Sequence, residues 1–282
     1  TMTPATTILL ALAVPLVGAV LIAAAHRAPN VRETVTMVTA SVLFLLVVSL
    51  TPLVLAGERP GVTLFEVMPG LALKFEVEPL GMLFGLIASG LWIVNSLYSI
   101  GYMRGNDEQH QTRFYVCFAG ALASAIGIAF AGNLLTLFVC YEALTLITYP
   151  LVTHAGTDEA RRGGRVYLGL LVGTSVVFLL VAIVWTWQLA GTLEFTAGGI
   201  LHDTASNATV GVLFALYMFG IGKAALMPFH RWLPAAMVAP VPVSALLHAV
   251  AVVKAGVFSV VKVVVYVFGV NEIAGLASVQ WL

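Results

Sequence analysis

Three charged side chains lie within long apolar stretches of this sequence. Glu142 stands in the middle of residues 133–153, and Lys223 and Lys254 occupy similar depths in two other apolar stretches. Placing one such charge inside a membrane costs about 2.5–3.5 kcal/mol on insertion scales. A chain that carries three of them needs a polar interior to hold them. The pattern therefore predicts a protein that moves protons or small cations.

The sequence around Glu142 and Lys223 suits proton transfer. With a rise of 1.5 Å per residue, Glu142 lies about 14 Å into a helix that begins near Asn133, close to the bilayer midplane. Lys223 follows Gly220 and Gly222 and precedes Pro228, which should interrupt the helix beside the amine. Buried lysines can titrate near neutral pH. The alternatives are a protonated Glu142 bonded to a neighbouring helix and a Lys223 that extends to the interface.

The last long apolar stretch contains His248, Lys254 and Lys262. In a continuous helix His248 and Lys254 lie about 9 Å apart along the axis and about 120° apart around it. They could form successive stations of a path that turns around the helix, although a hydrogen-bonded core histidine is the alternative for His248. Lys262 is nearer the helix end and is expected to snorkel to the interface, as an auxiliary group at most.

Two further residues follow the expected break in the helix. His230 is either a proton-uptake group or a solvated histidine, and Trp232 is expected to anchor this segment at the membrane interface. Both interpretations assume that the chain returns to the membrane surface after Pro228.

Composition defines the class of protein. The 282 residues are 60% hydrophobic and 9% charged with no net charge, whereas soluble domains carry about 25% charged residues. The chain is predicted to be an all-α polytopic membrane protein without a nucleic-acid partner.

Cys117 and Cys140 lack metal-ligand spacing and are expected to be packed thiols. No phosphate loop, dinucleotide fingerprint or iron–sulfur motif is present, so we expect no metal, cofactor or catalytic residue.

Eight transmembrane helices are predicted from runs of about 20 apolar residues. Their approximate ranges are 4–25, 32–56, 79–103, 113–131, 133–153, 166–190, 208–227 with a broken extension to 238, and 242–269. The expected organisation is an N-terminal part (1–111), a five-helix part (112–270) and a short tail (271–282).

Residues 62–77 connect the second and third predicted helices. Their apolar and polar residues partly alternate on either side of Met68, Pro69 and Gly70, which is typical of a β-hairpin. We expect a short external hairpin, with Glu76 and Glu78 on a solvated surface.

The charge distribution of the loops predicts the orientation. Only Arg59 and Lys74 lie in the loops on one side, whereas the side reached after odd-numbered helices holds eight arginines. By the positive-inside rule the eight-arginine side is cytoplasmic, so the N-terminus of this multi-pass protein would face outward from the cell (inner) membrane. The eight are Arg27, Arg32, Arg104, Arg113, Arg161, Arg162, Arg165 and Arg231.

Three blocks of the sequence resemble one family. They cover residues 132–142 with Glu142, residues 222–234 with Lys223, and residues 239–258 with His248 and Lys254. They are similar to the antiporter-like proton-translocating membrane subunits of respiratory complex I, Mrp-type sodium/proton antiporters (their D-type or A-type subunits) and membrane-bound hydrogenases. The resemblance covers the first eight helices of the family fold.

This resemblance implies a function and partners. Glu142 would pair with Lys223, and His248 and Lys254 would continue a proton path. The chain would belong to a multisubunit complex for Mrp-type cation/proton antiport; whether sodium, potassium or only protons move is left open. Other membrane subunits would be its partners, one of them supplying the second repeat of the family fold. The alternatives are a proton-pumping subunit of a complex I-like or hydrogenase oxidoreductase, and a non-transporting scaffold of an ion- or inorganic-carbon-uptake complex.

Overall fold

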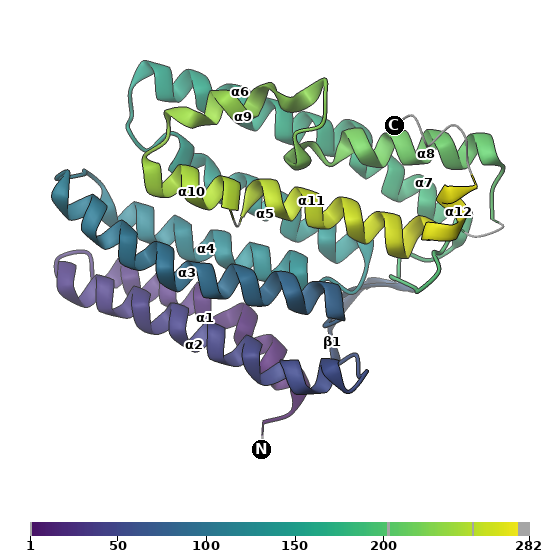
Figure 1. Cartoon of the computed structure of the whole chain (residues 1–282), viewed down its shortest axis with the longest axis horizontal. Coiled ribbons are helices and arrows are strands. Elements are labelled where there is room, and N and C mark those ends of the chain that lie inside the picture. Colours follow the sequence, from purple (N-terminus) through teal and green to yellow (C-terminus); the bar gives the residue numbers. More distant parts are fainter. Residues whose placement is uncertain (1, 202–203, 250, 276–282) are drawn as a thin grey trace.

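The computed structural model describes residues 2–201, 204–249 and 251–275. Within these residues, seven helices are long and apolar enough to cross a membrane, and a shorter apolar helix supplies the predicted seventh crossing. A two-stranded sheet is the other regular element there (Figure 1). The predicted fold class, a polytopic helical protein with a hairpin, is confirmed.

The first five helices follow the predicted ranges. Proline occupies the first turn of the first three helices, where its missing N–H breaks no helical bond. The Asn133 side chain caps the fifth helix by accepting a hydrogen bond from Thr136 N at 2.8 Å. These helices are α1 (Pro4–Ala24), α2 (Pro29–Leu55), α3 (Pro79–Gly105), α4 (Gln111–Ala129) and α5 (Leu134–Val152).

The sixth span is a single long helix with a change of winding in its middle. α6 (Asp158–Thr174) continues through the π-helical segment η1 (Ser175–Leu179) into α7 (Leu180–Ala190). The carboxylates of Asp158 and Glu159 lie in its first turn, where the helix dipole favours negative charge. The helix ends at Gly191, whose φ of +67° suits the left-handed C-terminal cap.

The predicted break in the seventh span is confirmed. α8 (Asn207–Gly220) stops in the interior and is followed by a 3₁₀ turn, η2 (Gly222–Ala224). A second turn, η3 (Phe229–Arg231), then leads into α9 (Trp232–Ala235) and η4 (Ala236–Val238).

The eighth span is less regular than the continuous helix we predicted. α10 (Val241–Ala249) and α11 (Val252–Val263) are separate elements, and the amide of Ala251 donates to Leu246 O at 2.8 Å. α11 continues into a π-helical segment, η5 (Val264–Phe268), and α12 (Val270–Ala274) follows. The angle calculated for His248 and Lys254 from an ideal helix therefore does not apply.

The predicted hairpin is confirmed. β1 (Gly61–Met68) pairs antiparallel with β2 (Leu71–Glu76), and Gly70 takes φ +81° in the turn. β2 also contacts the short connection between α4 and α5, because Glu76 N donates to Phe130 O at 2.7 Å and Gly132 N donates to Lys74 O at 2.9 Å. The hairpin is thus joined to the helix bundle rather than free in solution.

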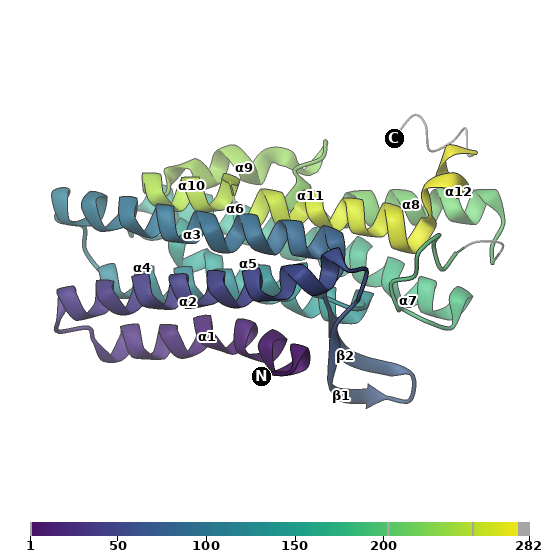
Figure 2. The same cartoon turned by 60° about the horizontal axis from the view of Figure 1, so that its bottom comes forward.

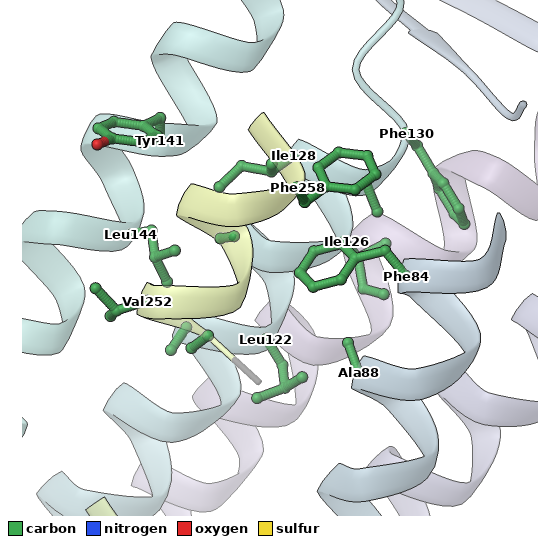
Figure 3. Packing of buried hydrophobic residues seen from close by; sticks show 14 of the residues in the cluster. Phe84, Ala88, Leu122, Ile126, Ile128, Phe130, Tyr141, Leu144, Val252 and Phe258 are labelled. Carbon is green, nitrogen blue, oxygen red and sulfur yellow. The ribbon is translucent and has the colours of Figure 1, made fainter. Parts of the chain in front are cut away.

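The helices form one bundle with two distinct ends. Figure 2 shows the hairpin at one end of α1–α3, hereafter the hairpin end, with the α1–α2 and α3–α4 connections at the opposite end. That opposite end, hereafter the arginine-rich end, also holds the α5–α6 connection at residues 153–157. In Figure 3, α11 packs through Val252 and Phe258 among side chains of α3, α4 and α5.

Candidate functional site

The helix break at Lys223 is enclosed by three close backbone approaches. A Cβ on Gly220 would lie 2.5 Å from Leu179 N of η1, one on Gly222 would overlap the Thr174 hydroxyl, and one on Gly256 would overlap the backbone of Lys223 and Ala224. Glycine at these positions lets η1 pack directly against the end of α8, and lets α6 and α11 pack directly against η2. Irregular backbone is tolerated at membrane depth when it is packed in protein, and this arrangement meets that condition.

The Lys223 side chain is fully buried and points to α5. Its Nζ donates to the backbone oxygen of Tyr141 at 2.8 Å and to Thr145 Oγ1 at 2.5 Å. The same nitrogen lies 3.2 Å from the centroid of the Tyr141 ring, whose face attracts a cation. The Lys223 amide also donates to Tyr141 Oη at 3.0 Å. The amine is therefore held by neutral groups of one helical turn.

Glu142 is next to this turn but does not bond to the amine. Its side chain is half-buried, its Oε1 is buried without a hydrogen-bond partner, and its charge acts on Lys223. Among the described residues, the two groups form no direct ion pair. A buried carboxylate oxygen without a partner is costly, so Glu142 has capacity for a proton or a polar neighbour. Pairing of Glu142 with Lys223 stays a prediction.

A second layer of hydrogen bonds supports the break. Thr148 Oγ1 and Tyr167 Oη lie 2.6 Å apart, and the Tyr167 ring packs edge-on against Trp232 with centroids 5.6 Å apart. Trp232 Nε1 donates to Gly222 O at 2.8 Å and its side chain is fully buried. The interfacial anchoring predicted for Trp232 is therefore wrong, because the indole closes the interior side of the break.

The residues that hold the amine were not among those predicted from the sequence. Tyr141, Thr145 and Thr148 follow a spacing of four and three residues, so they share one face of α5. That polar face was visible in the sequence. The hydrogen bond to Tyr141 O was not, because every residue has a backbone carbonyl and the sequence does not mark this one.

The structure does not bring His248 and Lys254 to Lys223. His248 is half-buried, with Nε2 3.4 Å from Met237 Sδ. Lys254 is exposed and lines an apolar groove of about 310 Å³ between α3 and α11, beside Phe84 and Phe258. His230 is exposed, next to Phe229, whose ring packs against Phe178 of η1 and Phe219 of α8. The roles assigned to these three residues stay predictions.

Lys262 differs from its prediction. Its side chain is fully buried, and Nζ lies 2.9 Å from Glu78 Oε1 and donates to Ala131 O at 2.6 Å. Snorkelling of Lys262 is therefore wrong. Glu78, expected on a solvated surface, is 4% exposed. The ion pair between Lys262 and Glu78 offsets part of the free energy that removing each charge from water costs.

A family signature and two curated relatives place this chain in the same family. The signature of the family described as NADH:quinone oxidoreductase/Mrp antiporter, TM, matches residues 131–278, just over half of the chain. The A/B-type subunit of a probable K⁺/H⁺ antiporter of Rhizobium meliloti (strain 1021) is 33% identical over 79% of this chain and 22% of its own length. The A-type subunit of a Na⁺/H⁺ antiporter of Alkalihalophilus pseudofirmus (strain ATCC BAA-2126 / JCM 17055 / OF4) is 29% identical over 76% of this chain and 26% of its own length. The chain thus spans about a quarter of the length of these two curated relatives.

Two solved structures share the fold. A chain of the Mrp complex from Dietzia sp. DQ12-45-1b superimposes with a TM-score of 0.75 and 29% identity, over 90% of this chain and 27% of the other. A chain of a membrane-bound sulfane sulfur reductase, an archaeal respiratory membrane complex, gives a TM-score of 0.76 over 90% of this chain and 52% of the other. The latter is 22% identical, so it supports the fold alone.

Proposed function

We propose that this chain, which belongs to the NADH:quinone oxidoreductase/Mrp antiporter transmembrane family, carries protons within a multisubunit membrane complex for cation/proton antiport. Glu142, Lys223, His248 and Lys254 are the proposed proton-carrying residues. The single observation that carries this proposal is the fully buried Lys223 amine at a helix break, held only by neutral oxygens and a ring face.

The chemistry of that site favours a reversible change of protonation. Tyr141 O and Thr145 Oγ1 both accept hydrogen bonds, and a neutral amine still has two N–H donors for them. The site can therefore hold Lys223 with or without its third proton. Glu142 follows Tyr141 in the chain. Because an opposite charge close to an amine favours its charged form, loss of the Glu142 charge would favour the neutral amine in this proposal.

The proposed cycle begins when a proton enters from the arginine-rich end and reaches Lys223, with the exposed His230 as the proposed uptake group. A change of charge in a neighbouring subunit then weakens the interaction between Glu142 and Lys223. Lys223 gives up its proton, which passes through His248 or water towards Lys254. Coupling between subunits is electrostatic in this scheme, so no large rearrangement of the helices is required.

The exposed Lys254 supports the proposal that other membrane subunits are partners. A lysine at this depth on an apolar groove faces lipid unless another polypeptide covers it, and such a charge is costly in lipid. A chain or segment with the second repeat of the family fold would cover it. The proposed orientation, with the arginine-rich end in the cytoplasm, follows from the positive-inside rule.

Substitution of the two central residues in the complete complex tests the function. Glu142→Gln and Lys223→Ala should suppress cation-dependent proton flux in membrane vesicles while the complex still assembles. Glu66→Gln, in the exposed part of β1, is the matched control and should leave flux unchanged. Near-normal flux in both test variants would reject these roles and would favour a scaffold that does not transport.

A further inference from the structure

A second buried acid–amine pair lies at the hairpin end, apart from the Lys223 site. Glu78 and Lys262 are 5% and 1% exposed at their side chains and are joined at 2.9 Å. Glu78 occupies the N-cap position of α3 without a side-chain cap bond, and Lys262 is in the last turn of α11. Lys262 Nζ also lies 4.7 Å from the Phe195 ring centroid and 5.4 Å from that of Phe258. Two aromatic rings therefore lie beside the Lys262 amine.

A graded series of charged groups leads from this pair towards solvent. Glu76 precedes Glu78 by two residues in the chain, and the Arg59 guanidinium lies over the Tyr266 ring, 6.0 Å from its centroid. Beyond them, Lys74 binds Glu76 at 3.0 Å and Glu194 at 2.7 Å. Side-chain exposure rises along the series, from 1% at Lys262 and 5% at Glu78 to 22% at Glu76, 29% at Lys74 and 39% at Glu194.

Three separate segments build this series, which makes it more than a local helix cap. The hairpin supplies Lys74 and Glu76, the α7–α8 connection supplies Glu194, and α11 supplies Lys262. Asn133 joins the hairpin to the α7–α8 connection, because its Nδ2 donates to Ala72 O at 2.7 Å and lies 3.4 Å from Glu194 Oε1. Lys262 of α11 binds the same region of the chain, because its Nζ donates to Ala131 O at 2.6 Å.

The helix geometry beside Lys262 is also unusual. The π-helical segment η5 begins two residues after Lys262, and such segments occur frequently at functional sites. The other π-helical segment, η1, packs against the helix break at Lys223 through Leu179 and Gly220. Both buried lysines thus lie next to a π-helical segment.

We propose that Glu78 and Lys262 form a proton-transfer station at the hairpin end, which the Glu76–Lys74–Glu194 cluster connects to the aqueous phase. The Lys262 ammonium gives one proton to the Glu78 carboxylate, which leaves a neutral amine and a neutral acid. The Glu78 acid then passes that proton towards the aqueous phase by way of Glu76. The amine regains a proton from the membrane interior. This station rests on the proposed function, for which it supplies the hairpin-side end of the proton path.

Replacement of Lys262 by arginine distinguishes a proton-transfer role from an ion pair that only stabilises the fold. Arginine keeps the positive charge and can still bind Glu78, but it does not release a proton in proteins. Proton flux is measured in vesicles that hold the complete complex, together with the amount of assembled complex and its thermal midpoint. Lys262→Arg and Glu78→Gln should each lower flux per assembled complex by about tenfold or more.

The matched control is Glu33, a buried carboxylate that also forms ion pairs. Glu33 lies at the arginine-rich end, where it pairs with Arg104 and, at 3.5 Å, with Arg32. Glu33→Gln should lower the thermal midpoint and leave flux per assembled complex unchanged. If Lys262→Arg does not assemble, the double variant Glu78→Gln/Lys262→Gln replaces it, because two neutral amides can retain a hydrogen bond.

The outcomes separate this inference from the proposed function. The station alone would be overturned if Lys223→Ala abolishes flux while Lys262→Arg, or the double variant, keeps flux within about twofold of the wild type. Loss of flux in the assembled Lys262 variant supports the station. Equal flux in the wild type and Lys223→Ala would reject both the proposed function and this inference.

Discussion

Substitution of Gly256 by alanine should disturb the Lys223 site without changing any charged or polar group. Gly256 lies on α11, where the added Cβ would overlap Ala224 N and the carbonyl carbon of Lys223. All of these are backbone atoms, so a side-chain rotation cannot relieve the overlap. Either η2 or α11 must move.

The size of the effect follows from the geometry. The Lys223 carbonyl oxygen would lie 2.8 Å from the new Cβ, and Ala224 N and the Lys223 carbonyl carbon would lie closer still, whereas ordinary van der Waals contacts begin at 3.4 Å, so the segments must separate by more than 0.6 Å. Overpacking of this kind typically costs about 1–3 kcal/mol. If the original position of Lys223 is required for transport, the same free energy lowers the transporting population by about 5- to 150-fold.

The assay is cation-dependent proton flux per assembled complex, measured with the thermal midpoint of the complex. Gly101→Ala is the matched control, because it makes the same change in α3 where a Cβ meets nothing within 4 Å. In that exposed helical position the change should be neutral or stabilise the protein by about 0.5–1 kcal/mol. Flux in Gly256→Ala within the range of Gly101→Ala would refute the view that the exact position of η2 matters.

Three further predictions concern single interactions. Thr145→Val keeps the shape of the side chain and removes one acceptor of the Lys223 amine, so it should destabilise the complex by about 1.5–3 kcal/mol in thermal or denaturant unfolding; an unchanged midpoint would mean that the bond is unimportant. Trp232→Phe leaves Gly222 O without its donor and should cost about 1–3 kcal/mol, whereas Trp185→Phe, at a partly buried position, should cost less. Burial lowers the pKa of His154 from 6.5, and Arg113 and His110 add to this effect; because the unfolded chain then binds more protons, stability should fall as pH drops through 6.5. His154→Gln should remove that part of the pH dependence of the thermal midpoint, and an identical profile in the variant would contradict the assignment.

Much of the fold could be predicted because it follows from short-range patterns. Apolar run length gave the spans, alternation around Met68 and Gly70 gave the hairpin, and Pro228 after Lys223 gave the break. The start of the fifth helix near Asn133 was also predicted, and the Asn133 side chain caps the helix there.

The misplaced residues are those whose environment depends on distant segments. The snorkelling of Lys262 was argued from its depth along one helix, yet its partners are Glu78 of α3 and the carbonyl of Ala131. Trp232 was placed by its residue type, although its indole reaches back to Gly222 within the bundle. In both cases a specific polar partner outweighs the general preference of the side chain for the interface.

Proton flux in the Lys223→Arg variant of the complete complex tests the central claim most directly. Arginine keeps the positive charge and the donors for Tyr141 O and Thr145 Oγ1, but its guanidinium stays protonated. If Lys223 must lose and regain a proton, the variant should assemble normally and carry at least about tenfold less flux than the wild type. Wild-type flux in an assembled Lys223→Arg complex would contradict the account.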